Sequence, residues 1–330
     1  MSADPIRLLV YEGPDLSYPY RVTPERLERI ARRTGVASFL ESRFIDDEDA
    51  FRTCIGDADA TAGWRVPKEI VAEKGKNLAW IQLTGVGVNH LSPLDWLPHG
   101  TELLTASGAQ CPTAADTAAM AMLMLNGRMP EIIAQQHKAE WKSAFAAPIA
   151  GKTALIVGVG RMGQAVARVA KALGLRVLGI SRTGRPRRGI EAMATLAELY
   201  ELLPQADFVV LAPALTDKTR GLMTARAFAS MKRTAGIVNL GRAALIDEAA
   251  MIAALRAGWI GGAVLDGYAQ EPLPSSSPLW TTPNLIALPH VASGEPSLFM
   301  DRVVEILCSN LRRWREGQPL VNRVSRRYGY

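Results

Sequence analysis

The chain has few cysteines and no long apolar run. Its three cysteines, Cys54, Cys111 and Cys308, are odd in number and widely separated. This pattern is typical of reduced thiols in a cytosol and argues against a disulfide framework or a metal site. The longest apolar runs, such as Ala118–Leu125, are far too short to span a bilayer, and the N-terminus has no apolar signal segment. We therefore expect a cytoplasmic protein without a metal or a membrane partner.

Low-complexity tracts and internal repeats are also missing. The formal net charge of +6 is modest, and arginines between residues 182 and 188 supply part of it. Because aromatic side chains are not interleaved with the basic ones, nucleic acid is not an expected partner. The apolar content of 48% is that of a globular protein, and 330 residues most simply form two domains, each with its own core.

One stretch predicts a dinucleotide site. An apolar run at Ala154–Val157 precedes Gly158, Gly160 and Gly163, apolar residues then recur at helical spacing, and a second apolar run follows at Val177–Ile180. This order of strand, glycine turn, helix and strand is the βαβ unit of dinucleotide-binding proteins. Gly158 permits the turn, Gly160 lets the backbone approach the pyrophosphate, and Gly163 lets the helix pack on the strand. The free N–H groups at the helix start face the anion.

The residues after the second strand indicate which dinucleotide binds. Units that bind NAD usually place Asp or Glu about 20 residues past the glycines, on the ribose 2′-hydroxyl. Ser181, Arg182, Thr183 and Arg185 occupy this region, and no acidic residue occurs between Gly158 and Ile190. Arginine and hydroxyl groups would pair with a 2′-phosphate, which a carboxylate would repel. We expect NADP(H) to be preferred, with NAD(H) possible; a solvated basic loop is the alternative interpretation.

The first hundred residues predict a small α/β unit of their own. Thr23 is expected to cap a helix that begins at Pro24. Two glycines in Gly85-Val86-Gly87 follow an expected strand, and open backbone there can offer N–H groups to a carboxylate. An ordinary turn is the alternative, and the residues alone leave both open. The expected strands are Ile6–Tyr11, Ala58–Trp64, Leu78–Leu83 and Glu102–Thr105, and the expected helices are Pro24–Arg33 and Pro67–Glu73.

The rest of the chain continues the alternation of strands and helices. Residues Pro112–Lys138 are expected to form one long helix, and Trp141–Ile149 a loop. Further expected strands are Ala206–Leu211, Gly236–Leu240, Gly262–Leu265 and Leu285–Leu288, and further expected helices are Thr195–Leu203, Ala225–Met231, Asp247–Ala257 and Val303–Arg315.

Three polar residues follow consecutive strands near the end of the chain. Arg242, Glu271 and His290 together supply what hydride transfer to a carbonyl needs. The imidazole can give a proton to the developing alkoxide, and the carboxylate can orient the ring and favour its charged form. The guanidinium can grip a substrate carboxylate and polarise the carbonyl. Of the other histidines, His99 and His137 are expected at the surface. His90 adjoins the second glycine loop, Gly85–Gly87, and has no obvious carboxylate partner.

These residues resemble the D-isomer-specific 2-hydroxyacid dehydrogenase family, in Asn239-Leu-Gly-Arg242, Leu265-Asp266, Glu271-Pro-Leu-Pro274 and Pro289-His290. The run Ser181–Arg185 is most similar to NADPH-using glyoxylate and hydroxypyruvate reductases. The resemblance implies two Rossmann-like doubly wound parallel-sheet domains. A dinucleotide-binding domain, residues 107–290, would be inserted in a substrate domain, residues 1–106 and 291–330. It also implies reduction of a small 2-oxo acid to the D-2-hydroxy acid, and a homodimer through the cofactor domain.

The resemblance assigns roles to single residues. Arg242 would bind substrate, Glu271 would orient the ring, and His290 would be the acid and base. The Gly85–Gly87 loop would hold the substrate carboxylate through the Val86 and Gly87 N–H groups, and Asp266 would hold the nicotinamide carboxamide. The remaining cofactor contacts would be Arg161 and Met162 at the pyrophosphate, Ala212 and Pro213 beside the adenosine half, and Leu240, Gly241 and Ala292.

The sequence departs from the family pattern in two places besides Ser181. Gly267-Tyr268 stands where many members have Val-Phe, and His90 ends a glycine loop in which Asn is more common. These departures bear on substrate and cofactor preference. Formate oxidation is disfavoured because those enzymes pair the histidine with Gln, whereas phosphite oxidation stays open. A dinucleotide-sensing corepressor and an inactive Rossmann protein are the alternatives outside this chemistry.

Overall fold

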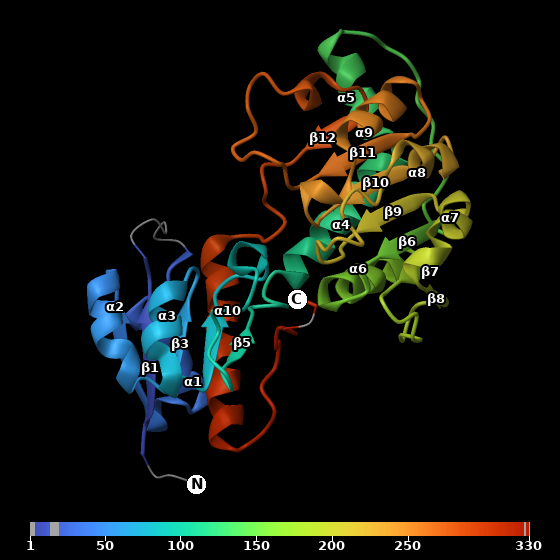
Figure 1. The fold of residues 1–330 in the computed structure, drawn as a ribbon. Helices are drawn as coiled ribbons and strands as arrows, with labels where there is room; N and C mark the ends of the chain where they lie inside the picture. Colours follow the sequence, from blue (N-terminus) through green and yellow to red (C-terminus); the bar gives the residue numbers. More distant parts are fainter. Residues whose placement is uncertain (1–3, 14–19, 327, 330) are drawn as a thin grey trace. The chain divides into compact units, whose positions relative to one another are not determined.

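The computed structural model describes residues 4–13, 20–326 and 328–329, which divide into two compact units (Figure 1). Unit 1 comprises residues 1–109 and 294–330, and unit 2 comprises residues 110–293. Each unit is built on one parallel β-sheet, which confirms the expected fold class.

The unit boundaries lie a little later than the sequence suggested. They follow Ala109 and Ser293 rather than residues 106 and 290. Hydrogen bonds explain the difference. Asn322 donates to the Ser107 carbonyl at 2.8 Å, which keeps this segment on unit 1, and Thr113 donates to the Ser293 carbonyl at 2.8 Å, which keeps that segment on unit 2.

Unit 1 has a five-stranded sheet in the order β2-β1-β3-β4-β5. Helices α1 and α10 share one apolar cluster with the sheet, and α2 and α3 contribute to a second. Strand β2 and helix α2 were not expected. Strand β2 lies at the edge of the sheet, and its sequence LESRFI is largely polar and lacks an apolar run. The bounds are β1 Ile6–Tyr11, β2 Leu40–Ile45, β3 Ala60–Gly63, β4 Trp80–Leu83, β5 Glu102–Leu104, α1 Pro24–Thr34, α2 Glu48–Cys54, α3 Lys68–Lys74 and α10 Pro296–Arg315.

Helix α10 brings the end of the chain onto unit 1. It begins seven residues before the expected Val303, because the Glu295 carboxylate accepts the N–H groups of Ser297 and Leu298 at 2.9 and 2.8 Å. Its fully buried Asn310 donates to Gln82 Oε1 in β4 at 2.9 Å and accepts the Val321 N–H at 2.8 Å. These bonds tie the helix to the strand that precedes the second glycine loop.

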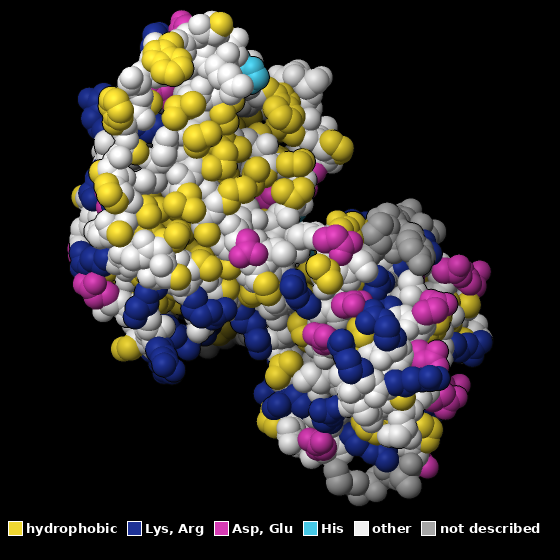
Figure 2. Space-filling model, turned by 180° about the vertical axis from the view of Figure 1, so that it is seen from behind, with side chains coloured by type: hydrophobic (Ala, Val, Ile, Leu, Met, Phe, Trp, Pro, Cys, Tyr) yellow, Lys and Arg dark blue, Asp and Glu magenta, His cyan; other side chains and the backbone are white. Residues whose placement is uncertain are grey.

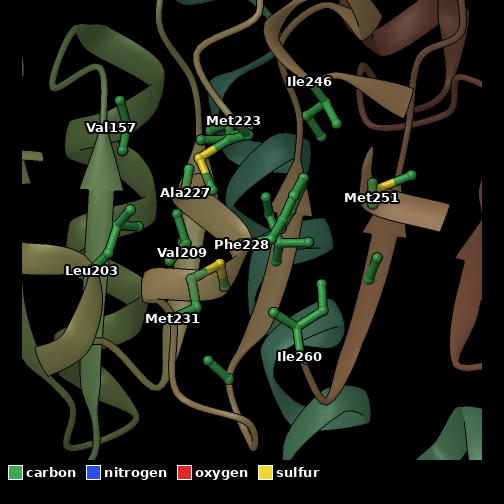
Figure 3. Close-up of a cluster of buried hydrophobic side chains, with 14 of the residues drawn as sticks. Val157, Leu203, Val209, Met223, Ala227, Phe228, Met231, Ile246, Met251 and Ile260 are labelled. Atoms are coloured by element: carbon green, nitrogen blue, oxygen red, sulfur yellow. The ribbon is translucent and has the colours of Figure 1, made fainter. Parts of the chain in front are cut away.

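Unit 2 has a seven-stranded sheet in the order β12-β11-β10-β9-β6-β7-β8. Alternate side chains of the strands enter two apolar clusters, one with α4 and α6 and the other with α7, α8 and α9; Figure 3 shows part of the second, around Phe228. The strands are β6 Thr153–Val157, β7 Arg176–Ile180, β8 Ala192–Ala194 (not expected), β9 Phe208–Leu211, β10 Gly236–Asn239, β11 Gly262–Leu265 and β12 Leu285–Ala287; the helices are α4 Cys111–Asn126, α5 Met129–His137, α6 Arg161–Ala172, α7 Leu199–Leu202, α8 Ala225–Ser230 and α9 Glu248–Arg256.

The prediction of one long helix over Pro112–Lys138 was wrong. The segment forms α4 and α5, separated at Gly127 and Arg128. Arg128 has a left-handed backbone with φ of 54°, and Pro130 lies in the first turn of α5, where its missing N–H is tolerated. In the part of the chain that the structure describes, none of the helices combines the length and apolar character that a bilayer span requires.

Replacing the buried amide on α10 tests its structural role. Asn310→Ala leaves Gln82 and the Val321 N–H without their partner, so the free energy of unfolding should fall by about 1–3 kcal/mol. Asn77→Ala is the control, because Asn77 is exposed and makes one hydrogen bond to the Gly56 carbonyl. Urea unfolding measures both variants; equal stability of Asn310→Ala and the parent protein would contradict this account.

Candidate active site

Nearly all the predicted cofactor-binding and catalytic residues of unit 2 lie at the carboxyl edge of the seven-stranded sheet. Because all seven strands are parallel, their carboxyl ends lie at one edge. The chain moves from β6 outward through β7 and β8, and then from β9 outward to β12, so the order reverses between β6 and β9. Ligands of open α/β sheets bind at such a switch point.

The first glycine loop lies at this switch point. Gly158 has φ of 96°, and a Cβ there would lie 2.3 Å from the Pro213 nitrogen, after β9. A Cβ on Gly163 would lie 2.2 Å from the Gly158 carbonyl oxygen. These two glycines are therefore required by close packing within the protein.

The middle glycine has a different environment. A Cβ on Gly160 would have no atom of the described chain within 4 Å, and Gly160 caps α6 without a side-chain hydrogen bond. The first N–H groups of α6 are thus available beside open space, next to the exposed Arg161 and half-buried Met162. This arrangement fits a dinucleotide pyrophosphate.

The end of β7 presents a basic, hydroxyl-rich turn. Ser181 Oγ accepts the Gly184 N–H at 3.2 Å, and Arg182, Thr183 and Arg185 are exposed. The next acidic residue in the sequence, Glu191, pairs with Arg176 and donates its N–H to the Val177 carbonyl, so it lies near the opposite end of β7. The turn is therefore without a carboxylate of its own.

The predicted catalytic residues follow three neighbouring strands, β10, β11 and β12. His290 Nδ1 lies 2.7 Å from Glu271 Oε2, and Glu271 Oε1 accepts the Tyr268 N–H at 2.8 Å. Burial acts to raise the pKa of Glu271, but the hydrogen bonds from His290 and Tyr268 and the charges of His290 and Arg242 outweigh it, so the pKa lies below its usual range. Glu271 is therefore a carboxylate at neutral pH, placed to support an imidazolium.

Asp266 fixes the segment that carries His290. It is 5% exposed, and its two carboxylate oxygens accept the N–H groups of Val291 and Ala292 at 2.7 and 2.9 Å. Burial raises the pKa of Asp266, and these two N–H groups oppose the rise. The sequence did not reveal this structural role. Each oxygen keeps a second lone pair, so a further hydrogen bond to a carboxamide stays a prediction.

Arg242 is exposed on a turn that a buried asparagine holds. Asn239, 2% exposed, accepts the Gly241 N–H at 3.0 Å and donates to the Arg242 carbonyl at 3.0 Å. A Cβ on Gly241 would lie 2.6 Å from Leu245 Cδ1, while the buried Leu240 packs in the cluster around α4 and α6. The sequence gives one signal for this role of Asn239, a polar residue that ends an apolar strand.

The second glycine loop lies at the carboxyl edge of the sheet of unit 1. Among the described residues, the N–H groups of Val86 and Gly87 find no acceptor in the chain. Trp64, which follows β3, packs so closely that a Cβ on Gly85 would lie 1.8 Å from its ring. The Trp64 ring stacks on His90 with centroids 5.7 Å apart, and burial lowers the pKa of His90. The loop thus combines two unused donors with an aromatic wall.

Comparison with known proteins shows the family to which the chain belongs. A family model described as D-isomer specific 2-hydroxyacid dehydrogenase, NAD binding domain, matches residues 119–292. A glyoxylate reductase of Thermococcus kodakarensis is 30% identical over 319 residues, covering 92% of this chain and 95% of that protein. The chain belongs to the D-isomer specific 2-hydroxyacid dehydrogenase family. It is therefore an oxidoreductase with an NAD-binding domain.

Two solved structures are similar over nearly the whole chain. One is a D-isomer specific 2-hydroxyacid dehydrogenase from Xanthobacter autotrophicus in complex with NADPH and MES, with a TM-score of 0.83, 28% identity and coverage of 98% and 99%. The other is an NADPH-dependent glyoxylate/hydroxypyruvate reductase from Sinorhizobium meliloti in complex with NADP and sulfate, with a TM-score of 0.81, 26% identity and coverage of 98% and 100%.

Two glycine substitutions separate packing from ligand binding. Gly163→Ala brings a methyl against the Gly158 carbonyl and should lower the free energy of unfolding by about 1–3 kcal/mol. Gly160→Ala meets no protein atom, so stability should change by less than about 0.5 kcal/mol. Its methyl would fill the space proposed for the pyrophosphate, and the Kd for NADPH should rise about tenfold or more. Urea unfolding and NADPH fluorescence titration measure these effects; unchanged NADPH affinity of Gly160→Ala would contradict the assignment.

Proposed function

We propose that the protein transfers hydride from NADPH to a small 2-oxo acid, of the glyoxylate or hydroxypyruvate type, and forms the D-2-hydroxy acid. The observation that carries this proposal is the 2.7 Å contact between His290 and an ionised Glu271, at the strand end next to Arg242. Carbonyl reduction requires an imidazole that is paired with a carboxylate and donates the proton, and a guanidinium that binds the substrate.

The bound nicotinamide supplies the hydride; the protein positions the substrate and moves the proton. Arg242 binds the substrate carboxylate and polarises the carbonyl oxygen. The N–H groups of Val86 and Gly87, on unit 1, are donors of the kind that bind a carboxylate. His290, through Nε2, gives its proton to that oxygen as negative charge develops. Glu271 holds the other ring nitrogen, so the ring presents the protonated edge to the substrate.

The choice of NADPH is supported by the turn after β7. Arg182 and Arg185 can pair with a 2′-phosphate, and the hydroxyls of Ser181 and Thr183 can donate to it. The similar enzymes from Xanthobacter and Sinorhizobium were solved with NADPH and NADP. NAD(H) would bind more weakly, because its ribose lacks the phosphate that the arginines recognise.

Small substrates are favoured by the wall at the second glycine loop. The Trp64 ring covers Gly85 so closely that the loop has no space for even a methyl on that side. A 2-oxo acid whose carboxylate is bound by Val86 and Gly87 would place its side chain near this ring. Glyoxylate carries only a hydrogen on its carbonyl carbon and hydroxypyruvate only a hydroxymethyl group, so both fit this limit.

A homodimer through unit 2 is supported by exposed apolar side chains. Met120 and Leu123 on α4 are 43% and 45% exposed, and Trp141 and Phe145 in the loop after α5 are 98% and 88% exposed. Figure 2 shows apolar side chains gathered over a wide area of this unit. Such a patch on a soluble chain marks an association surface.

The buried, unbridged cysteines support a cytoplasmic location.

The proposed acid can be tested in one assay. The protein is mixed with NADPH and glyoxylate, hydroxypyruvate or a bulkier 2-oxo acid, with phosphite and NADP⁺ as the rival reaction. We expect turnover of the two small 2-oxo acids, and a loss of about 10²–10⁴-fold in kcat for His290→Ala. His99→Ala is the matched control, because His99 is exposed in the loop before β5 of unit 1. Near-normal turnover by His290→Ala would remove His290 from the mechanism.

The cofactor preference has its own test. Arg182→Asp places a carboxylate where the 2′-phosphate is proposed to bind. Losing a charge-assisted hydrogen bond costs about 1.5–3 kcal/mol, so the ratio of kcat/KM for NADPH to that for NADH should fall at least about tenfold. Arg256→Asp makes the same charge change at an exposed position in the last turn of α9 and should leave the ratio unchanged. An unaltered ratio in Arg182→Asp would reject the assignment.

A further inference from the structure

A tyrosine hydroxyl joins the ends of the two strands that carry the proposed acid and its carboxylate. The Tyr268 hydroxyl lies 2.9 Å from the Leu288 carbonyl oxygen and 3.1 Å from the Leu265 carbonyl oxygen. Leu265 ends β11, and Leu288 directly follows β12. The Leu288 N–H also donates to the Leu265 carbonyl at 2.8 Å, so the phenol extends the sheet pairing beyond its last regular bond.

The Leu288 carbonyl is shared with the histidine itself. The His290 N–H donates to it at 2.9 Å, forming a tight turn in which His290 has a left-handed backbone, with φ of 55°. A residue with a side chain adopts this conformation only where its surroundings hold it. Asp266 holds the backbone after His290, through Val291 and Ala292, and the Tyr268 hydroxyl holds the carbonyl before it.

The same tyrosine also holds the carboxylate. Its main-chain N–H donates to Glu271 Oε1 at 2.8 Å, while Glu271 Oε2 meets His290 Nδ1. The ring is half-buried against the apolar cluster that the sheet of unit 2 forms with α7, α8 and α9. Burial, followed by the charges of Asp266 and Glu271, raises the pKa of Tyr268 to about 12, so the hydroxyl is a donor throughout the neutral range.

We propose that Tyr268 is a positioning residue for the His290–Glu271 pair: its hydroxyl fixes the turn before His290, and its N–H fixes the carboxylate that the imidazole must meet. This inference rests on the proposed function of that pair. Tyr268 controls the rate of proton transfer and not the binding of substrate, because its hydrogen bonds within the described residues go to Glu271, Leu265 and Leu288 and not to the proposed substrate-binding groups.

Tyr268→Phe keeps the ring and the main-chain N–H and removes only the hydroxyl. In steady-state reduction of glyoxylate by NADPH, kcat per active site should fall about 3–10-fold, the effect of one hydrogen bond, while both KM values stay within about twofold. The alkaline limb of the kcat profile should move to lower pH, because a less well placed Glu271 supports the imidazolium less. Arg242 and Asp266, the other charged groups near the pair, are unchanged by the substitution.

Tyr200→Phe is the matched control, since Tyr200 is half-buried against the same cluster and its ring is covered by Arg226. It should match the parent protein in kcat and pH profile. Active sites are counted by NADPH titration, so that a loss of folded enzyme is not scored as a loss of kcat. A parental kcat per site and pH profile in Tyr268→Phe would overturn the inference, as would a reduction explained wholly by fewer sites. An inactive parent protein would instead overturn the proposed function.

Discussion

The left-handed backbone of His290 is the constraint on which the site depends. A histidine in this conformation needs hydrogen bonds on both sides, and the structure provides them from Asp266 and from the Leu288 carbonyl. In this turn His290 Nδ1 lies 2.7 Å from Glu271 Oε2, although the two residues follow different strands.

The sheet determines which residues can share the site. Strands β10, β11 and β12 are consecutive neighbours, so Arg242, Glu271 and His290 emerge side by side. The reversal of strand order between β6 and β9 places the first glycine loop at the same edge, where Gly158 packs directly against Pro213. One arrangement of parallel strands therefore places the proposed dinucleotide cradle and the proposed Arg242–Glu271–His290 triad at the same edge of the sheet.

The sequence predicts the parts of this structure that local patterns determine. The glycine spacing, the Thr23 cap and the apolar strands of unit 2 follow from periodicity and residue type. Strand β2 was missed because an edge strand with a polar surface lacks a continuous apolar run. The long helix was overextended because apolar residues continue across Gly127, and the reversal at Arg128 depends on a backbone conformation that periodicity does not encode.

The proposed catalytic side chains could be found from their places after the strands, whereas their supports could not. The roles of Asp266 and Tyr268 depend on main-chain groups about 20 or more residues away in the sequence, the Ala292 N–H and the Leu288 carbonyl. Hydrogen bonds between such distant residues form only in the folded sheet, so the sequence alone does not reveal them. The aromatic wall of Trp64 over Gly85 is a further contact between distant residues.

The central claim is that an ionised Glu271 sustains His290 as the proton donor, and the pH dependence of kcat in Glu271→Gln tests it most directly. The pKa of Glu271 is lowered, so the carboxylate persists at neutral pH and is lost only as the pH falls below the usual carboxyl range. Glutamine keeps the hydrogen bond but removes the charge. The account predicts a lower kcat and an alkaline limb displaced by about one pH unit toward acid. An unchanged profile would contradict it.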